Sequence, residues 1–130
     1  FRVGMACCFD LRFPLFLASY AAPGATRPID LLCAPSAFLD TTGRDHWDLL
    51  VRRAALDAQC YALAPNVARD EADDVPLYGH SMIADPWGRV LAQTGPHGDD
   101  LAVADLDRAV LDDVRHKLPL ARFGRPFVGR

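Results

Sequence analysis

The sequence predicts an α/β layered fold, because stretches with the features of strands alternate with stretches with the features of helices. Apolar runs of strand length occupy residues 3–8, 29–34 and 60–64, and helical patterns separate them. Alternation of this kind is typical of a sheet with helices packed on it. The length of 130 residues suits one compact domain or a large piece of one, and no internal repeat divides it.

The first 43 residues are expected to hold two strands and one short helix. The opening strand should be buried and should end at Cys8. A short helix is predicted at residues 14–21, because Pro14 is favourable in a first helical turn and a Pro-Gly pair follows the helix. The second strand covers residues 29–34, and residues 36–43 are expected to form a loop.

The clearest helix is predicted at residues 44–58. Asp45 and Asp48 stand in its first turn, where the positive end of the helix dipole favours acidic side chains. Its apolar residues recur at the spacing of one helical face, namely Trp47, Leu50, Val51, Ala54 and Ala55. The third strand, residues 60–64, follows this helix directly.

A hairpin is expected in the second half of the chain. Residues 66–78 are polar and acidic, so they are interpreted as a surface loop. Strands at 81–84 and 89–93 then flank the sequence D-P-W-G at 85–88, which is typical of a hairpin turn.

One more strand and one more helix are predicted to follow. Residues 101–105 read as the strand, and Asp107 can cap the helix. The helix carries apolar residues at helical spacing, and Pro119 ends it.

Composition and charge exclude several classes of function. The net charge is −3 and no basic block stands out, so nucleic acid is not an expected partner. No apolar run approaches the ~20 residues of a membrane helix, and no secretory signal is visible. The four histidines are scattered without ligand spacing, so we expect no metal and no cofactor.

The four cysteines indicate a reduced, cytoplasmic protein. Three of them lie in apolar strand-like runs, where free buried cysteines are common, and no C-x-x-C pair is present.

Cys8 is the candidate nucleophile. It ends an apolar run and begins a polar loop, and nucleophiles often occupy such strand-to-loop elbows because the side chain is exposed while the backbone is held. A thiol is a strong nucleophile once a base removes its proton. On residue type and position alone, a packed structural cysteine is the commoner outcome.

A family resemblance favours the catalytic interpretation. The segment 8–14, C-F-D-L-R-F-P, resembles the C-Y-D-x-R-F-P segment around the nucleophile of nitrilase-superfamily amidases, which are carbon–nitrogen hydrolases. The ω-amidase and deaminated glutathione amidase branches are the most similar in pattern. The resemblance continues in order along the chain at P-S-A-F (35–38), T-T-G (41–43), H-W-D (46–48), Q-C-Y (59–61), Y-G-H-S (78–81), D-P-W-G (85–88) and L-P (118–119).

The resemblance implies a particular α/β architecture. Residues 1–130 would be the C-terminal half of a four-layer α-β-β-α sandwich, and the N-terminal half of the same domain would be missing. The start at Phe1, directly before an apolar run, fits a truncated chain or a fragment. The resemblance also implies a homo-oligomer in which the helices at 14–21 and 44–58 pack across a two-fold axis.

The implied activity is that of an amidase that releases ammonia from a small carboxylated amide through a Cys8 thioester. A Glu would take the thiol proton, and the oxyanion donors would be a Lys ammonium and the backbone N–H of Phe9. Lys117 and Glu71 are the only lysine and the only glutamate. Neither stands in a motif that resembles its catalytic counterpart, so we expect both partners in the missing half and no activity in this chain alone.

Three residues are assigned to the substrate site by the same resemblance. Arg12 would grip a substrate carboxylate with its forked guanidinium; the alternative is an arginine that pairs with Asp10 and holds the loop. Phe38 and Thr42 would line the pocket; the alternatives are a core phenylalanine and a helix-capping threonine. Cys7 is expected in the core, because neighbours in a strand point to opposite faces.

Two other functions stay open. The chain could be a non-catalytic fragment or degenerate paralogue that packs against a partner. Departures at Ala54 and Asp57 from the family's R-A-R-A-I-E-N-Q helix pattern are expected to disturb a buried ion pair. A thiol redox protein is a weaker hypothesis, because the adjacent Cys7 and Cys8 would form a disulfide only with strain.

Overall fold

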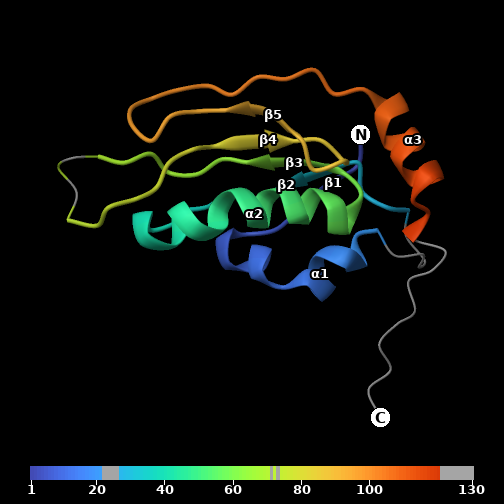
Figure 1. Ribbon diagram of the computed structural model, residues 1–130, viewed down its shortest axis with the longest axis horizontal. Coiled ribbons are helices and arrows are strands. Elements are labelled where there is room, and N and C mark those ends of the chain that lie inside the picture. The colour runs from blue at the N-terminus through green and yellow to red at the C-terminus, as the bar shows by residue number, and fades with distance from the viewer. Residues whose placement is uncertain (22–26, 71, 73, 121–130) are drawn as a thin grey trace, which may run out of the picture.

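The computed structural model describes residues 1–21, 27–70, 72 and 74–120. In this part of the chain, five strands form one mixed sheet in the order β1-β2-β3-β4-β5 (Figure 1). The elements in chain order are β1 (Val3–Met5), the 3₁₀ helix η1 (Cys8–Arg12), α1 (Pro14–Ser19), β2 (Leu31–Cys33), α2 (Asp40–Ala58), β3 (Tyr61–Ala64), β4 (Met82–Ala84), β5 (Val90–Gln93) and α3 (Arg108–Lys117).

The sheet has a parallel half and an antiparallel half. β1, β2 and β3 run parallel, and β4 and β5 add to β3 as the predicted antiparallel hairpin. The two parallel connections place α1 and α2 on the same face of the sheet (Figure 1). The fold is therefore the predicted α/β arrangement, with helices covering one face.

The core lies between that face and α2. Alternate strand residues, such as Leu32, Ala62 and Met82, are buried against the helix, as the twofold repeat of strands requires. The predicted apolar face of α2 is confirmed, because Trp47 and Val51 are fully buried. The Phe38 and Trp47 rings also meet in this core, edge to face, with centroids 4.9 Å apart.

The α2 helix begins at Asp40, one turn earlier than the predicted start at residue 44. The Thr-Thr-Gly sequence had favoured a loop, but Gly43 packs directly beneath Tyr78. A Cβ at position 43 would lie only 2.2 Å from the Tyr78 ring carbon Cγ. The glycine thus permits a close helix–loop contact, and this packing outweighs its low helix propensity.

Helix α3 is anchored at the amino ends of the parallel strands. Asp107 caps it as predicted, accepting a hydrogen bond from the Ala109 amide at 2.8 Å. Arg115 contacts Asp30, the buried residue that precedes β2, at 3.3 Å, and also donates to the Gln59 carbonyl before β3. Burial alone would raise the pKa of Asp30, but the Arg2 amide, Arg115 and Arg108 together hold this pKa below its ordinary value.

Two strand predictions were wrong. β1 ends at Met5, and Val3 and Met5 are exposed, because β1 lies at the edge of the sheet and no layer covers its second face. Residues 101–105 form no strand, and Leu101 and Val103 are 87% and 81% exposed. Their apolar alternation is real, but no neighbouring strand among the described residues pairs with them.

The face of the sheet opposite α2 carries an apolar row. The strand register aligns Met5, Cys33, Leu63 and Ile83 across four strands. No described helix covers this row (Figure 1). None of the described helices is both long and apolar enough to cross a membrane.

Candidate active site

The three parallel strands end along the same edge of the sheet, which is called the carboxyl edge and runs across the strands. The predicted site residues lie in the segments that follow these strand ends. Hydrogen bonding continues beyond the strands there: the Cys8 amide donates to the Pro35 carbonyl at 3.0 Å, and the Ser36 amide donates to the Pro65 carbonyl at 2.9 Å. This edge is where ligands bind in open parallel sheets.

Cys8 lies in a sharp elbow at this edge. It is half-buried and has a left-handed backbone with φ of 43°, which is uncommon for a residue with a side chain. Asp10 holds the turn, accepting from the Cys7 amide at 2.8 Å while its own amide donates to the Cys7 carbonyl. Asp10 is therefore structural, as expected, and the elbow keeps the Cys8 thiol on the edge of the sheet.

The Phe9 backbone amide is available to a ligand. Among the described residues, no acceptor outside η1 pairs with this N–H. The Phe9 side chain is exposed and meets Phe13 edge to face, with centroids 5.6 Å apart. A backbone N–H directly after a thiol, with no described acceptor outside η1, is a candidate oxyanion donor.

The four cysteines differ in exposure, and all are free thiols. Cys7 is exposed, so its predicted core position was wrong: it lies beyond the end of β1, at the residue that precedes η1, and so does not follow the strand alternation. Cys60 is fully buried, and this burial raises the pKa of its thiol to about 12. Cys60 stays protonated at neutral pH and is a structural residue.

Arg12 lies one turn beyond Cys8, at the end of η1. Its guanidinium carbon is 5.4 Å from the centre of the Phe38 ring and 5.8 Å from the centre of the Phe9 ring. Both distances fit cation–π contacts. The alternative pairing with Asp10 is not present, because the Asp10 carboxylate is bonded to the Cys7 amide and Arg12 donates instead to His46.

Phe38 and Thr42 are positioned by the start of α2. Phe38 is 4% exposed, so it is a core residue whose ring also lies beside Arg12. Thr42 does not cap α2, because the helix begins after Leu39; its hydroxyl donates back to the Leu39 carbonyl at 3.4 Å. The structure thus brings Arg12 and Phe38 together, while no described contact joins Thr42 to either residue.

Asn66 is a site-edge residue that sequence reasoning missed. It was placed at the start of a surface loop, yet it is buried. Its side chain accepts from the Phe38 amide at 2.9 Å and donates to the Gly79 carbonyl at 2.6 Å. Its backbone N–H donates to the Ser81 hydroxyl. A signal was present, because Pro65-Asn66 follows a buried strand just as Pro35-Ser36 does.

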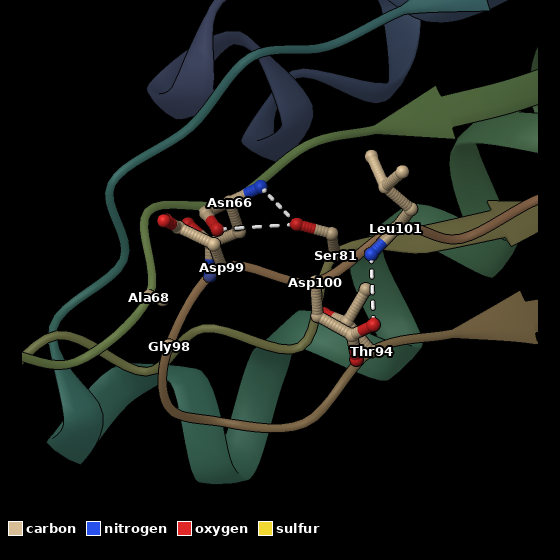
Figure 2. A pocket seen from close by; sticks show the side chains of 8 residues that line it. All are labelled: Asn66, Ala68, Ser81, Thr94, Gly98, Asp99, Asp100 and Leu101. Carbon is tan, nitrogen blue, oxygen red and sulfur yellow. Dashed lines mark hydrogen bonds between the residues drawn. The ribbon is translucent and has the colours of Figure 1, made fainter.

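A cavity of about 710 Å³ lies beside Asn66 and Ser81. Figure 2 shows the hydrogen bonds that join these two residues. The other lining residues of the cavity are Ala68, Thr94, Gly98, Asp99, Asp100 and Leu101. Cys8 and Arg12 do not line it, and its two carboxylates would repel an anion. We therefore assign the chemistry to the Cys8 edge, where the nucleophilic and cationic groups lie.

Arg53 and Asp57 lie one turn apart on α2, beside η1. Arg53 donates to the Leu11 carbonyl and so holds η1 against the helix. Arg53 Nε and Asp57 Oδ2 approach to 3.3 Å, yet neither atom has a hydrogen bond. Burial raises the pKa of Asp57, and Arg53 only partly counters this effect.

The described residues contain no group of three or more His, Cys, Asp or Glu side chains arranged to hold a metal ion. The candidate site is instead an elbow thiol, a free backbone amide and an arginine. These features are those of an α/β protein with a candidate thiol nucleophile at the carboxyl ends of its parallel strands.

The carbon-nitrogen hydrolase family profile matches residues 1–116. The chain therefore belongs to the carbon-nitrogen hydrolase family, and the resemblance to the nitrilase superfamily is confirmed.

The relatives are named hydrolases and amidases. The chain is 44% identical to the probable hydrolase nit2 of Schizosaccharomyces pombe, over 93% of this chain and 43% of that protein. It is 38% identical to the mouse deaminated glutathione amidase, over 96% of this chain and 37% of that protein. It is 41% identical to the chloroplastic omega-amidase of Arabidopsis thaliana, over 93% and 31%. The chain thus spans less than half the length of these relatives.

Solved structures show the same fold. The Saccharomyces cerevisiae protein Nit3, a member of branch 10 of the nitrilase superfamily, matches with a TM-score of 0.81 at 35% identity, over 91% of this chain and 42% of that chain. A mutant amidase from Nesterenkonia sp. AN1 matches with a TM-score of 0.66 at 26% identity, over 91% and 43%. In that amidase, the acetamide moiety of fluoroacetamide is added covalently at the active site cysteine.

We expect Asn66→Asp to loosen the sheet edge. The substitution keeps an acceptor for the Phe38 amide but places a carboxylate oxygen against the Gly79 carbonyl, where the native side chain donates. The free energy of unfolding should fall by about 1–3 kcal/mol, the cost of an unmet buried hydrogen bond. Urea denaturation measures this change. Gln93→Glu, on an exposed strand residue, is the matched control, and an equal loss in both variants would contradict the assignment.

Proposed function

We propose that this chain is the nucleophile-bearing half of a cysteine amidase that acts on small amides carrying a carboxylate. The observation that carries the proposal is the Cys8 elbow, in which a positive φ and the Asp10 turn hold the thiol beside the free Phe9 amide. The covalent adduct at the active site cysteine of the related Nesterenkonia amidase supports a nucleophilic role for a cysteine. The names of the amidase relatives support the reaction class.

The proposed reaction has two steps, formation of a thioester and its hydrolysis. The Cys8 thiolate attacks the amide carbon, and the C–N bond breaks as the nitrogen takes up a proton and leaves as ammonia. Water then attacks the thioester, which releases a carboxylic acid and restores the thiol. In each step the carbonyl oxygen gains negative charge, and the Phe9 N–H is placed to stabilise it.

We infer that a base and a second oxyanion donor come from outside this chain. Lys117 pairs with Asp113 at 2.7 Å on α3, which lies at the amino ends of the strands, whereas Cys8 follows the carboxyl end of β1. Glu71 lies outside the described residues. We therefore propose a complete hydrolase in which a half preceding Phe1 supplies Glu and Lys, so that this chain alone is inactive.

The apolar row Met5–Cys33–Leu63–Ile83 supports this arrangement. A face of this kind is buried when a second sheet packs on it about 10 Å away. The four-layer sandwich of the structural relatives supplies such a sheet, and a second half would also cover the exposed Cys7.

The substrate class rests on Arg12. The guanidinium lies one turn from the nucleophile and has no acidic partner among the described residues, so it can bind a carboxylate remote from the scissile bond. The neighbouring Phe38 ring suits an alkyl spacer. An ω-amide of a dicarboxylic 2-oxo acid has this combination of groups.

Cys8→Ala should lower amidase activity of the complete hydrolase on the order of 10³-fold or more, because the attacking thiol is lost. Iodoacetamide should label Cys8 faster than the other three thiols, as mass spectrometry of a time course can show. Cys7→Ala is the matched control and should stay active. Comparable activity in Cys8→Ala with loss in Cys7→Ala would reverse the assignment, and no activity in the wild type would favour a non-catalytic interaction module.

Arg12→Lys should raise KM for a carboxylated amide by about tenfold to a hundredfold. A charged hydrogen bond contributes about 1.5–3 kcal/mol, and a lysine ammonium lacks the two-pronged geometry. Steady-state kinetics on the amide and on its methyl ester measure the effect, which should be absent for the ester. Equal losses on both substrates, with a lowered Tm, would indicate a purely structural arginine.

We also propose that the complete hydrolase forms a homo-oligomer through the outer surface of α1 and α2. Large apolar side chains are exposed there, including Leu15 at 75% and Leu49 at 65%. Phe16 and Leu56 are also exposed on the same two helices. Exposed apolar side chains of this size would be covered in an interface between copies.

Leu49→Asp should shift the complete hydrolase from a dimer or larger oligomer toward monomer, because the interface would have to bury a charge. Analytical ultracentrifugation at micromolar concentration measures the shift. Val75→Asp, on an exposed loop residue, is the control and should leave the assembly intact. A wild type that sediments only as monomer would refute the interface.

A further inference from the structure

The guanidinium of Arg12 is held by three side chains, and none of them is acidic. Two are the aromatic rings of Phe9 and Phe38, and the third is the imidazole of His46. Six other described arginines pair with carboxylates, namely Arg44, Arg52, Arg53, Arg69, Arg108 and Arg115. These contacts therefore orient the Arg12 guanidinium, and no described carboxylate neutralises its positive charge.

The contact with His46 is specific. Arg12 Nη1 lies 3.3 Å from His46 Nδ1. A guanidinium can only donate, so His46 Nδ1 is the acceptor in this contact. One N–H of Arg12 is used in this contact. The other N–H donors are left for a ligand, which a bidentate internal carboxylate would not allow.

The structure of α2 fixes where His46 lies. Its neighbour Trp47 is fully buried, and the indole Nε1 donates to the His80 carbonyl at 2.6 Å. Gly43 packs beneath Tyr78 one turn earlier, which fixes the same helix at a second point. Successive helical residues are separated by about 100°, so these two anchors set the direction of His46, which lies exposed beside η1.

We propose that His46 is a positioning residue for substrate recognition. It aims the Arg12 guanidinium at the substrate carboxylate and leaves the charge of Arg12 uncompensated. His46 acts only through Arg12, so the inference rests on the proposed function of Arg12 as the carboxylate-binding group. It adds a determinant of specificity that lies 38 residues beyond Cys8 in the chain, on a different helix.

Three substitutions at His46 separate orientation from charge. His46→Leu removes the acceptor. His46→Asn keeps an acceptor without charge, and His46→Asp keeps an acceptor but adds a carboxylate that would pair with Arg12 and repel the substrate. His116→Leu changes another exposed histidine, on α3 at the opposite edge of the sheet, and serves as the control.

The test is steady-state kinetics of the complete hydrolase on succinamate and on its methyl ester. We expect His46→Leu to raise KM for succinamate about threefold to tenfold, the effect of one hydrogen bond. The value of kcat and the kinetics on the ester should be unchanged. His46→Asp should raise KM at least as much, whereas His46→Asn and His116→Leu should resemble the wild type.

Besides the absence of any His46 effect, two results would overturn the inference. The first is equal losses of His46→Leu on succinamate and its ester, because a structural role affects both substrates. The second is a His46→Asp enzyme as good as His46→Asn, because charge at this position would then be irrelevant. The Arg12→Lys kinetics distinguish the levels of failure: a selective Arg12 effect without a His46 effect rejects only this inference, and no selective Arg12 effect rejects the substrate assignment as well.

Discussion

The candidate site depends on hydrogen bonding that continues past the ends of three parallel strands. β1, β2 and β3 end at the same edge, and their following segments stay joined through the Cys8, Ser36 and Phe38 amides. Buried backbone donors require partners, so each segment is held by its neighbour. The segments that follow the strands are therefore hydrogen bonded to one another, and these bonds hold the Cys8 thiol and the Phe9 amide in place.

Asn66 completes this set of hydrogen bonds at the third strand. Its side-chain amide joins the segment before α2 to the segment before β4, and the residue is buried. The same segment before α2 carries Phe38, whose ring contacts both Trp47 and Arg12. The position of the arginine therefore depends on contacts that run from β3 through Asn66 and Phe38 to η1.

The two edges of the sheet are built for different tasks. At the amino edge, Asp30 pairs with the guanidinium groups of Arg108 and Arg115 and accepts from the Arg2 backbone amide, so its charge is neutralised internally and α3 is fixed. At the carboxyl edge, Arg12 contacts aromatic rings and an imidazole, so its charge is left for a ligand. This difference explains why Lys117, on α3, cannot serve Cys8, and why a catalytic lysine is proposed from a second half.

The class of fold, the family and the main helices and strands could all be predicted from the amino-acid sequence. Period-three-to-four burial on α2, the D-P-W-G hairpin and the Asp107 cap all depend on neighbours in the chain, and local patterns report such features well. Four features could not be predicted from the sequence and became known from the tertiary structure. They are the start of α2, the exposure of Cys7, the absence of a strand at residues 101–105 and the partners of Arg12. Each of these depends on a group distant in sequence, such as Tyr78 against Gly43 or His46 against Arg12, or on a covering layer that the described residues do not supply. Local patterns carry no information about such contacts, because they form only when the sheet brings separate segments to one edge.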